Sequence, residues 1–167
     1  IKTWRDKSTM ELAGIVMDEY ENTPIIDRPG EICVDAIGIG AGVVDRLQEL
    51  DLPARAINVA ESSSLSQKYM RLRDELWGRA REWFEEKNCK LPDDQGLVQE
   101  LAAPRFAFTS TGKIKIESKD EMRKRGIKSP DLADSFCLTF AGNAIVGVHG
   151  NKYAWTSTLD VDTSYVV

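Results

Sequence analysis

The chain has 167 residues, of which 42% are hydrophobic and 29% are charged, and its formal net charge is −5. This length and composition are those of one globular domain with a hydrophobic core. The acidic balance argues against a domain that coats nucleic acid non-specifically, because such domains are basic overall. No apolar stretch approaches the ~20 residues needed to cross a bilayer. The polar first segment, IKTWRDKSTM, lacks the apolar region of a signal peptide and an initiator Met, as expected for a piece of a longer chain.

The residue types that usually carry metal or nucleophile chemistry are few. Cys33, Cys89 and Cys137 form no CxxC pair, so we expect neither a zinc site nor a disulfide framework, which fits a reducing, cytosolic setting. The chain has one histidine, His149, in an irregular C-terminal segment, where we expect it at the surface. Catalysis by a Ser-His-Asp or Cys-His arrangement therefore lacks a credible base.

The first third of the chain predicts a helix followed by a βαβ unit. The helix is predicted over residues 8–22, because apolar residues recur on one helical face and its start, Ser8 with Glu11, fits a capping box. Residues 31–36, EICVDA, form an apolar run typical of a buried strand. A helix over residues 40–50 and a strand over Ala54–Val59 follow, and the short connections predict parallel strands.

The middle of the chain predicts two helices and a hairpin. The longest helical pattern runs over Gln67–Lys87 and has a broad apolar face. A short helix follows from Pro92 to Leu101. Residues 105–117, RFAFTSTGKIKIE, alternate on each side of a Ser-Thr-Gly turn, as expected for a β-hairpin.

Two further helices are predicted before the irregular C-terminal segment. The basic segment SKDEMRKRG forms a helix that ends at Gly126. The segment SPDLADSFCLTFAG opens a helix with Ser129 as its N-cap and Pro130 in the first helical position, and its final glycine closes it. We expect one domain over residues 1–142 and a C-terminal tail or arm over residues 143–167.

Three glycines in five positions, Gly38, Gly40 and Gly42, follow the first predicted strand. Their spacing differs from the dinucleotide fingerprint GxGxxG, and no Lys-Ser/Thr pair follows them as in a P-loop. We therefore interpret them as turn and close-packing residues rather than a phosphate cradle. Asp35 precedes them at the carboxyl end of the strand, where open α/β sheets bind ligands. Position alone leaves open whether Asp35 binds a ligand or caps the following turn.

Asp131 and Asp134 lie three residues apart on the last predicted helix. The helix dipole explains Asp131, but Asp134 stands one turn further on, among apolar residues. A buried carboxylate is costly unless a cation or donor satisfies it, and no Arg or Lys follows within one turn. A metal ion is one candidate partner, because Asp35 and Asp134 would supply the hard oxygen ligands that Mg²⁺ or Mn²⁺ prefers. The alternative is two structural aspartates that lie far apart.

Five segments occur in the same order in one known family: VDAIGIGAGVVDRLQEL, LRDELWGRAREWFEE, LVQELAAPRFAF, GKIKIESKDEMRKRG and SPDLADSFCLTFA. They resemble the carboxy-terminal nuclease domain of the large terminase subunit of tailed bacteriophages and prophages, over about Lys2 to Ala141. The resemblance implies an α/β, RNase H-like (integrase/resolvase) fold, with a mixed sheet flanked by helices. It also implies a metal-dependent endonuclease that cuts concatemeric viral DNA during genome packaging.

The same resemblance implies the catalytic residues. Asp35 matches the family's acidic residue at the end of the central strand, and Asp134 matches the acidic residue on the final helix. Asp131 matches a neighbouring position that some members also use near the metals. These side chains would help to hold two Mg²⁺ or Mn²⁺ ions. The family's first catalytic aspartate lies before IKTWR, so we expect this chain to lack that ligand and its first strand or two, to bind metal weakly and to cut poorly.

The implied partners are double-stranded DNA and, in the whole motor, an upstream ATPase domain, a terminase small subunit and a portal. The implied location is the cytoplasm of a bacterial host, and the resemblance implies no membrane as a partner. Seven basic and three acidic residues stand between Lys113 and Lys128, so the hairpin and the basic helix would contact phosphates without reading sequence. The alternative for this segment is a solvated charged face. The candidate DNA-binding residues are Lys113, Lys115, Lys119, Arg123, Lys124 and Arg125.

Two other functions stay open at this level. One is a non-catalytic assembly or docking module of the packaging motor, which the missing strand and the acidic net charge favour. The other is a different RNase H-like nuclease, such as a junction resolvase. A small-molecule nucleotide-binding domain is the weakest hypothesis, because the chain has no phosphate fingerprint.

Overall fold

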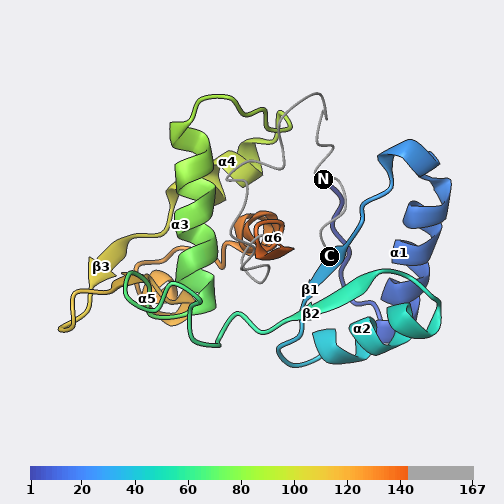
Figure 1. The fold of residues 1–167 in the computed structure, drawn as a ribbon, viewed down its shortest axis with the longest axis horizontal. Helices are drawn as coiled ribbons and strands as arrows, with labels where there is room; N and C mark the ends of the chain where they lie inside the picture. The colour runs from blue at the N-terminus through green and yellow to red at the C-terminus, as the bar shows by residue number, and fades with distance from the viewer. Residues whose placement is uncertain (143–167) are drawn as a thin grey trace.

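The computed structural model describes residues 1–142, which form an α/β fold with two small sheets and flanking helices (Figure 1). The predicted tail over residues 143–167, with its single histidine, lies outside the described residues. Within residues 1–142 no helix is long and apolar enough to span a membrane. Cys33, Cys89 and Cys137 are free thiols.

The N-terminal part is the predicted helix followed by the predicted βαβ unit. The two strands pair in parallel, from Ile32 opposite Ala54 to Asp35 opposite Ile57. One face of α1, the strands and α2 share a small hydrophobic core. The elements in chain order are α1 (Thr9–Asn22), the short 3₁₀ helix η1 (Ile25–Asp27), β1 (Ile32–Asp35), α2 (Gly40–Glu49) and β2 (Ala54–Ile57).

The predicted capping box at the start of α1 is confirmed. The backbone N–H of Glu11 donates to the hydroxyl of Ser8 over 3.2 Å, and the backbone N–H of Ser8 donates to the Glu11 carboxylate over 2.9 Å. Two of the helix-end donors that lack an intrahelical partner are thereby satisfied. The start of α1 therefore follows from residues that are neighbours in sequence.

The glycines after β1 act as turn and packing residues, as their spacing predicts. Gly38 has φ +73°, a conformation that favours glycine. A Cβ atom on Gly40 would lie 1.8 Å from the backbone oxygen of Asp35, so α2 can begin this close to β1 only with a glycine there. A Cβ on Gly42 would make an ordinary contact with Thr9, 3.6 Å away. Gly40 thus sets how closely α2 approaches the end of β1.

The C-terminal part contains the remaining helices and the hairpin. Its hydrophobic core lies where α3 and α4 pack against α6, around Leu76, Leu97 and Phe136. The hairpin strands pair antiparallel, with Phe106 opposite Ile116. The elements are α3 (Leu72–Glu85), α4 (Gln95–Ala102), β3 (Phe106–Phe108), β4 (Ile114–Ile116), α5 (Lys119–Lys124) and α6 (Asp131–Leu138).

Helix α3 begins later than predicted, at Leu72 rather than Gln67. The buried carboxylate of Glu75 explains the difference, because it binds the segment before the helix. It accepts hydrogen bonds from the hydroxyls of Ser63, over 2.6 Å, and Ser64, over 2.8 Å. The residues before Leu72 are therefore held in turns that pack back on α3, although their apolar pattern continues the helical period.

The expected single mixed sheet is instead two separate two-stranded sheets within the described residues. Strand β4 pairs with β3 on one side and, through a bridge between Ile114 and Tyr69, with the loop before α3 on the other. Both sides of β4 are therefore paired within the C-terminal part of the chain. Strand β3 pairs only with β4 among residues 1–142.

The glycines of α2 give a matched stability test. Gly40→Ala should lower the free energy of unfolding by about 1–3 kcal/mol or more, because its Cβ overlaps the Asp35 carbonyl. Gly42→Ala should be neutral or stabilise by up to about 1 kcal/mol, because alanine favours the helix and meets no close neighbour. Urea denaturation followed by circular dichroism measures both. Equal stability of the two variants would contradict the packing role of Gly40.

Candidate active site

One cavity of ≈ 200 Å³ is lined by all three of the predicted acidic residues, although they are far apart in sequence. Asp35 enters it from the end of β1, and Asp131 and Asp134 enter it from the first turn of α6. Two cationic side chains, Arg73 of α3 and Lys119 of α5, line the same cavity. The fold therefore places carboxylates and cations from separate elements around one space.

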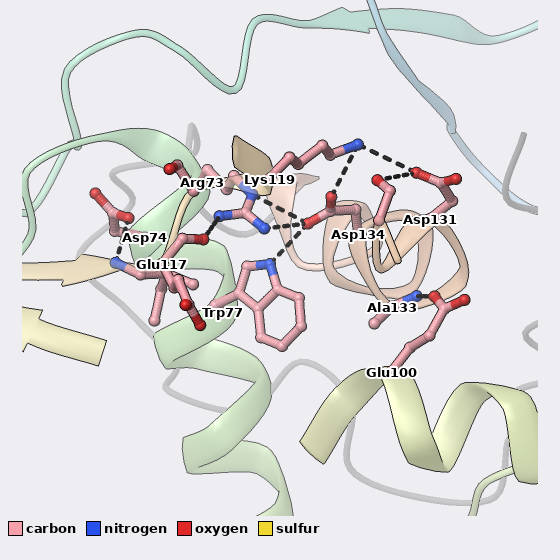
Figure 2. Close-up of polar contacts among 12 residues, drawn as sticks. Arg73, Asp74, Trp77, Glu100, Glu117, Lys119, Asp131, Ala133 and Asp134 are labelled. Carbon is pink, nitrogen blue, oxygen red and sulfur yellow. Dashed lines mark hydrogen bonds and ion pairs between the residues drawn. The ribbon is translucent and has the colours of Figure 1, made fainter. Parts of the chain in front are cut away.

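The carboxylate of Asp134 is the most heavily engaged group of the cavity (Figure 2). The indole N–H of Trp77 donates to its Oδ1 over 2.9 Å, and Nε of Arg73 donates to the same oxygen over 3.1 Å. Nη2 of Arg73 also lies 3.0 Å from Oδ1. These two atoms form an ion pair, but their geometry is not that of a hydrogen bond. Lys119 Nζ lies 3.2 Å from the other oxygen, Oδ2. Cations on α3 and α5 thus satisfy a carboxylate whose own helix offers none.

Lys119 bridges the two acids of α6. Its Nζ lies 3.2 Å from Oδ1 of Asp131 as well as 3.2 Å from Oδ2 of Asp134. Burial lowers the pKa of Lys119, but the charges and hydrogen bonds of Asp134 and Asp131 raise it more, so its pKa lies above the usual value. Burial raises the pKa of Asp131, but hydrogen bonds from Ser129 and Lys119 outweigh it and hold that pKa below its usual value. Both charges of this pair are stabilised at neutral pH.

Asp35 performs one of the two roles that its sequence position left open, the cap of the following turn, and ligand binding stays a prediction. Its Oδ1 accepts a hydrogen bond from the backbone N–H of Ile37 over 3.1 Å, so it caps the turn that follows β1. It also lines the cavity with Asp134 and is only partly buried. One carboxylate oxygen is therefore tied to the turn, and the group stays part of the cavity wall.

The start of α6 is capped by a residue of another helix. The predicted N-cap was Ser129, but the structure places Pro130 there, and the Ser129 hydroxyl donates instead to Asp131 over 2.6 Å. Proline has no side-chain acceptor, and Glu100 of α4 takes its place (Figure 2). The Glu100 carboxylate accepts the backbone N–H groups of Leu132, over 2.7 Å, and Ala133. Helix α6 ends at Leu138, earlier than predicted, because its last turn tightens at Thr139 and Phe140.

A buried aspartate ties the hairpin to α3. Asp74 is 3% exposed, and its two oxygens accept the backbone N–H groups of Ile116, over 2.8 Å, and Arg71, over 2.9 Å. Arg73 adds a second link, because its Nη1 donates to the backbone carbonyl of Glu117 over 3.1 Å. The end of β4, and with it the start of α5 and Lys119, is therefore positioned by α3.

The donor set fits a hard divalent cation in chemistry, since Asp35, Asp131 and Asp134 offer carboxylate oxygens. Residues 1–142 contain no group of three or more acidic, Cys or His side chains already arranged to hold a metal ion. The ammonium of Lys119 lies between the two acids of α6. A cation bound there would share these carboxylates with Lys119.

The six predicted DNA-binding residues lie on the hairpin and around α5. Besides Lys119, three of them form ion pairs with nearby acids. Lys115 lies 3.5 Å from Glu121, and Arg123 lies 2.8 Å from Asp120. Arg125 pairs with Glu117. The ion pairs of Lys115 and Arg123 are solvent-exposed and weak, and the DNA-binding role of the whole set stays a prediction.

Arg73, Trp77 and Glu100 are site residues that the sequence pattern did not indicate. Trp77 is a core residue, 8% exposed, but its indole N–H also donates to Asp134 in the cavity. Arg73 and Asp134 are 61 positions apart, and Glu100 and Leu132 are 32 apart. No periodicity or motif spacing relates residues at such separations.

No model of a protein family matches the chain, and no curated protein matches it. Its α/β fold does have solved counterparts. The chain is similar to the nuclease domain of the large terminase subunit gp2 of bacterial virus Sf6, with 19% identity and a TM-score of 0.58 over 78% of this chain and 70% of that one. A mutant of that domain solved with manganese matches at 18% identity and a TM-score of 0.58, over 78% of this chain and 71% of its own.

A mutant of the same domain solved with calcium matches at 18% identity and a TM-score of 0.57, over 78% of this chain and 70% of its own. At these identities the likeness establishes the fold. The chain has the fold of a phage large-terminase nuclease domain, in agreement with the resemblance of its sequence.

The indole donor to Asp134 can be tested with two tryptophans of α3. Trp77→Phe should lower the free energy of unfolding by about 1.5–3 kcal/mol, because it removes a hydrogen bond to a charged group but keeps an aromatic ring. Trp83→Phe makes the same chemical change in a ring that packs against Phe84. It should lower the free energy of unfolding by less than about 1.5 kcal/mol. Urea denaturation at neutral pH compares them. A Trp77 variant no less stable than the Trp83 variant would argue against the bond.

The cap from α4 makes a separate prediction. Glu100→Ala should destabilise the protein by about 1–2 kcal/mol, because two backbone N–H groups of α6 lose their acceptor. Glu100→Gln keeps a side-chain oxygen as acceptor and should therefore lose less stability than the alanine variant. Thermal denaturation of both variants gives the order, and equal losses would show that the acceptor atom is unimportant.

Proposed function

We propose that this chain is an RNase H-like, divalent-metal-dependent endonuclease domain that cuts viral DNA during genome packaging. One observation carries the proposal. Asp35 and Asp134, which lie on separate elements, line one cavity in a chain with the fold of a phage terminase nuclease domain. Acidic side chains in one cavity suit metal-assisted phosphodiester hydrolysis better than acid–base chemistry by a histidine.

Asp35 and Asp134, with Asp131 beside them, are the residues that would hold Mg²⁺ or Mn²⁺. When bound, two such ions supply an activated water and stabilise the leaving 3′ oxygen of an in-line displacement at phosphorus. Arg73 and Trp77 hold the Asp134 carboxylate in one orientation, and Glu100 holds the helix that carries it. The side chain of Lys119 is 47% exposed and would contact a phosphodiester that enters the cavity.

The proposed substrate is double-stranded DNA, bound through its phosphates. The basic residues that would contact the phosphates lie on the hairpin and on or just after α5: Lys113, Lys115, Lys119, Arg123, Lys124 and Arg125. Contacts of this kind position a duplex without reading its sequence. In a complete packaging motor we propose that the domain works beside an ATPase domain, a small terminase subunit and a portal.

Cleavage and metal binding together test the proposal. With Mn²⁺, the intact domain, including the strand that carries the family's first catalytic aspartate, should relax and linearise supercoiled plasmid, and Asp35→Asn or Asp134→Asn should lower the rate at least about 100-fold. The matched control is Asp45→Asn, which removes an exposed carboxylate of α2 outside the cavity and should leave the rate unchanged. In calorimetric titrations, the affinity for Mn²⁺ should fall in Asp35→Asn and Asp134→Asn and stay unchanged in Asp45→Asn. Full activity in Asp35→Asn would overturn the site assignment.

The pairing of Asp134 with Arg73 and Lys119 favours a second candidate, a docking module of the packaging motor without catalysis. In that case these charges would be structural. The chain would then bind no Mn²⁺ and cut no plasmid, yet bind another packaging component with or without metal. Preferential cutting of four-way junctions over plasmid would instead favour a junction resolvase.

A further inference from the structure

The three aspartates of the cavity share one feature, which is that one oxygen of each carboxylate, Oδ1, is already bound by donors of the chain. Oδ1 of Asp35 accepts a backbone N–H, and Oδ1 of Asp131 and of Asp134 accept side-chain donors. The second oxygens are more open. Among residues 1–142, only Oδ2 of Asp134 has a partner, the ammonium of Lys119. Each acid therefore has mainly one oxygen available to a further ligand.

Oδ1 of Asp134 has no lone pair left for a ligand (Figure 2). A carboxylate oxygen has two lone pairs. The indole N–H of Trp77 takes one of them, over 2.9 Å, and Nε of Arg73 takes the other, over 3.1 Å. Both donors are fixed in place, because Trp77 is 8% exposed and Nη1 of Arg73 also donates to the backbone carbonyl of Glu117.

The partner of Oδ2 of Asp134 can move. The Lys119 ammonium lies 3.2 Å from this oxygen, at the end of a side chain that is 47% exposed. A lysine ammonium on its flexible stem can turn toward solvent, whereas the guanidinium and the indole beside Oδ1 are held by other contacts. A cation in the cavity can therefore reach Oδ2 of Asp134 but not Oδ1.

The other two acids follow the same pattern to different degrees. Oδ1 of Asp131 accepts the hydroxyl of Ser129 over 2.6 Å and the ammonium of Lys119 over 3.2 Å. Oδ1 of Asp35 accepts one hydrogen bond, from the backbone N–H of Ile37 over 3.1 Å, and so keeps one lone pair. The restriction to one oxygen is therefore strongest at Asp134 and weakest at Asp35.

Ligands that give one oxygen each suit a small ion better than a large one. Mg²⁺ takes six oxygens at about 2.0–2.1 Å in octahedral geometry and keeps several of its waters, so single carboxylate oxygens are enough for it. Mn²⁺ also takes octahedral oxygen sites. Ca²⁺ takes six to eight oxygens at about 2.3–2.6 Å and commonly uses both oxygens of a carboxylate. A carboxylate with one blocked oxygen therefore disfavours the larger ion.

We propose that Trp77 and Arg73 make Asp134 a ligand with one available oxygen. Ser129 acts in the same way on Asp131, and the site therefore prefers Mn²⁺ or Mg²⁺ to Ca²⁺. All three are positioning residues, which act on the ion through the carboxylates that they bind. The inference rests on the proposed function, because it takes the cavity as a divalent-metal site, and it adds how the site chooses its ion.

Calorimetric titration of the intact domain with Mn²⁺ and with Ca²⁺ tests the inference. Trp77→Phe removes one donor to Oδ1 of Asp134, so this carboxylate can offer both oxygens to the larger ion. The ratio of the Ca²⁺ to the Mn²⁺ dissociation constant should fall about 10-fold, since outer contacts of a metal ligand typically change metal affinity by about 10- to 100-fold. The matched control, Trp83→Phe, alters a ring that packs against Phe84 and should leave the ratio unchanged.

Ser129→Ala tests the second acid in a variant that keeps the core intact. It removes the hydroxyl donor to Asp131, while α6 keeps its cap from Glu100. The same ratio should fall about 3-fold or more, and this result decides the inference if Trp77→Phe does not fold. The control is Ser110→Ala, which removes a hydroxyl from the hairpin turn outside the cavity and should have no effect.

Infrared difference spectroscopy reads the coordination directly. The antisymmetric and symmetric stretching bands of a carboxylate lie farther apart when it binds a metal through one oxygen than when it binds through two. The unmodified domain with Mn²⁺ should show the wide separation, and Trp77→Phe with Ca²⁺ should show the narrow one. A narrow separation in the unmodified domain with Mn²⁺ overturns the inference.

The outcomes separate this inference from the proposed function. An equal loss of affinity for both ions in Trp77→Phe and Ser129→Ala, at an unchanged ratio, overturns the inference even if the domain cuts plasmid with Mn²⁺. These donors would then have a purely structural role. A domain that shows the expected ratios but does not cut plasmid supports the inference and contradicts the proposed function. Binding of neither ion overturns both.

Discussion

The carboxylate of Asp134 is the junction on which the C-terminal part of the molecule depends. It lies on α6, receives hydrogen bonds from Arg73 and Trp77 of α3, and pairs with Lys119 at the start of α5. The Arg73 and Asp134 side chains are 17% and 20% exposed, so their charges are largely removed from water. Removing one partner of such a pair typically costs about 3–5 kcal/mol, because the other charge is left buried and unpaired.

The same junction shapes the chemistry of the cavity. Asp134 and Asp131 are already neutralised by cations of the chain, and Asp35 is tied by one oxygen to its own turn. This compensation allows three carboxylates to share a space of ≈ 200 Å³ in an acidic chain, because like charges are otherwise unfavourable at short range. The two compensating cations, Arg73 and Lys119, line the same cavity as the acids.

Several supports of the site lie outside the cavity. Glu100 takes the capping role that Pro130 cannot perform, and Asp74 fixes the hairpin from inside the core. Gly40 lets α2 start against the carbonyl of Asp35. Glu100 and Asp74 each satisfy backbone atoms of another element, whereas Gly40 allows a close approach of two elements. The positions of Asp35, Asp134 and Lys119 are therefore set by contacts among elements more than by the elements themselves.

The sequence by itself determined the elements whose causes are local. The capping box of α1 and the glycine turn after Asp35 follow from residues a few positions apart, and the parallel βαβ unit and the antiparallel hairpin follow from the order of short segments and their connections. Only the tertiary structure decided the partners of Asp134, the cap of α6 from Glu100, the late start of α3 and the separation of the two sheets. The physical reason is that periodicity and capping act within one or two turns. A buried charge, in contrast, is satisfied by whichever donors the packed helices bring to it.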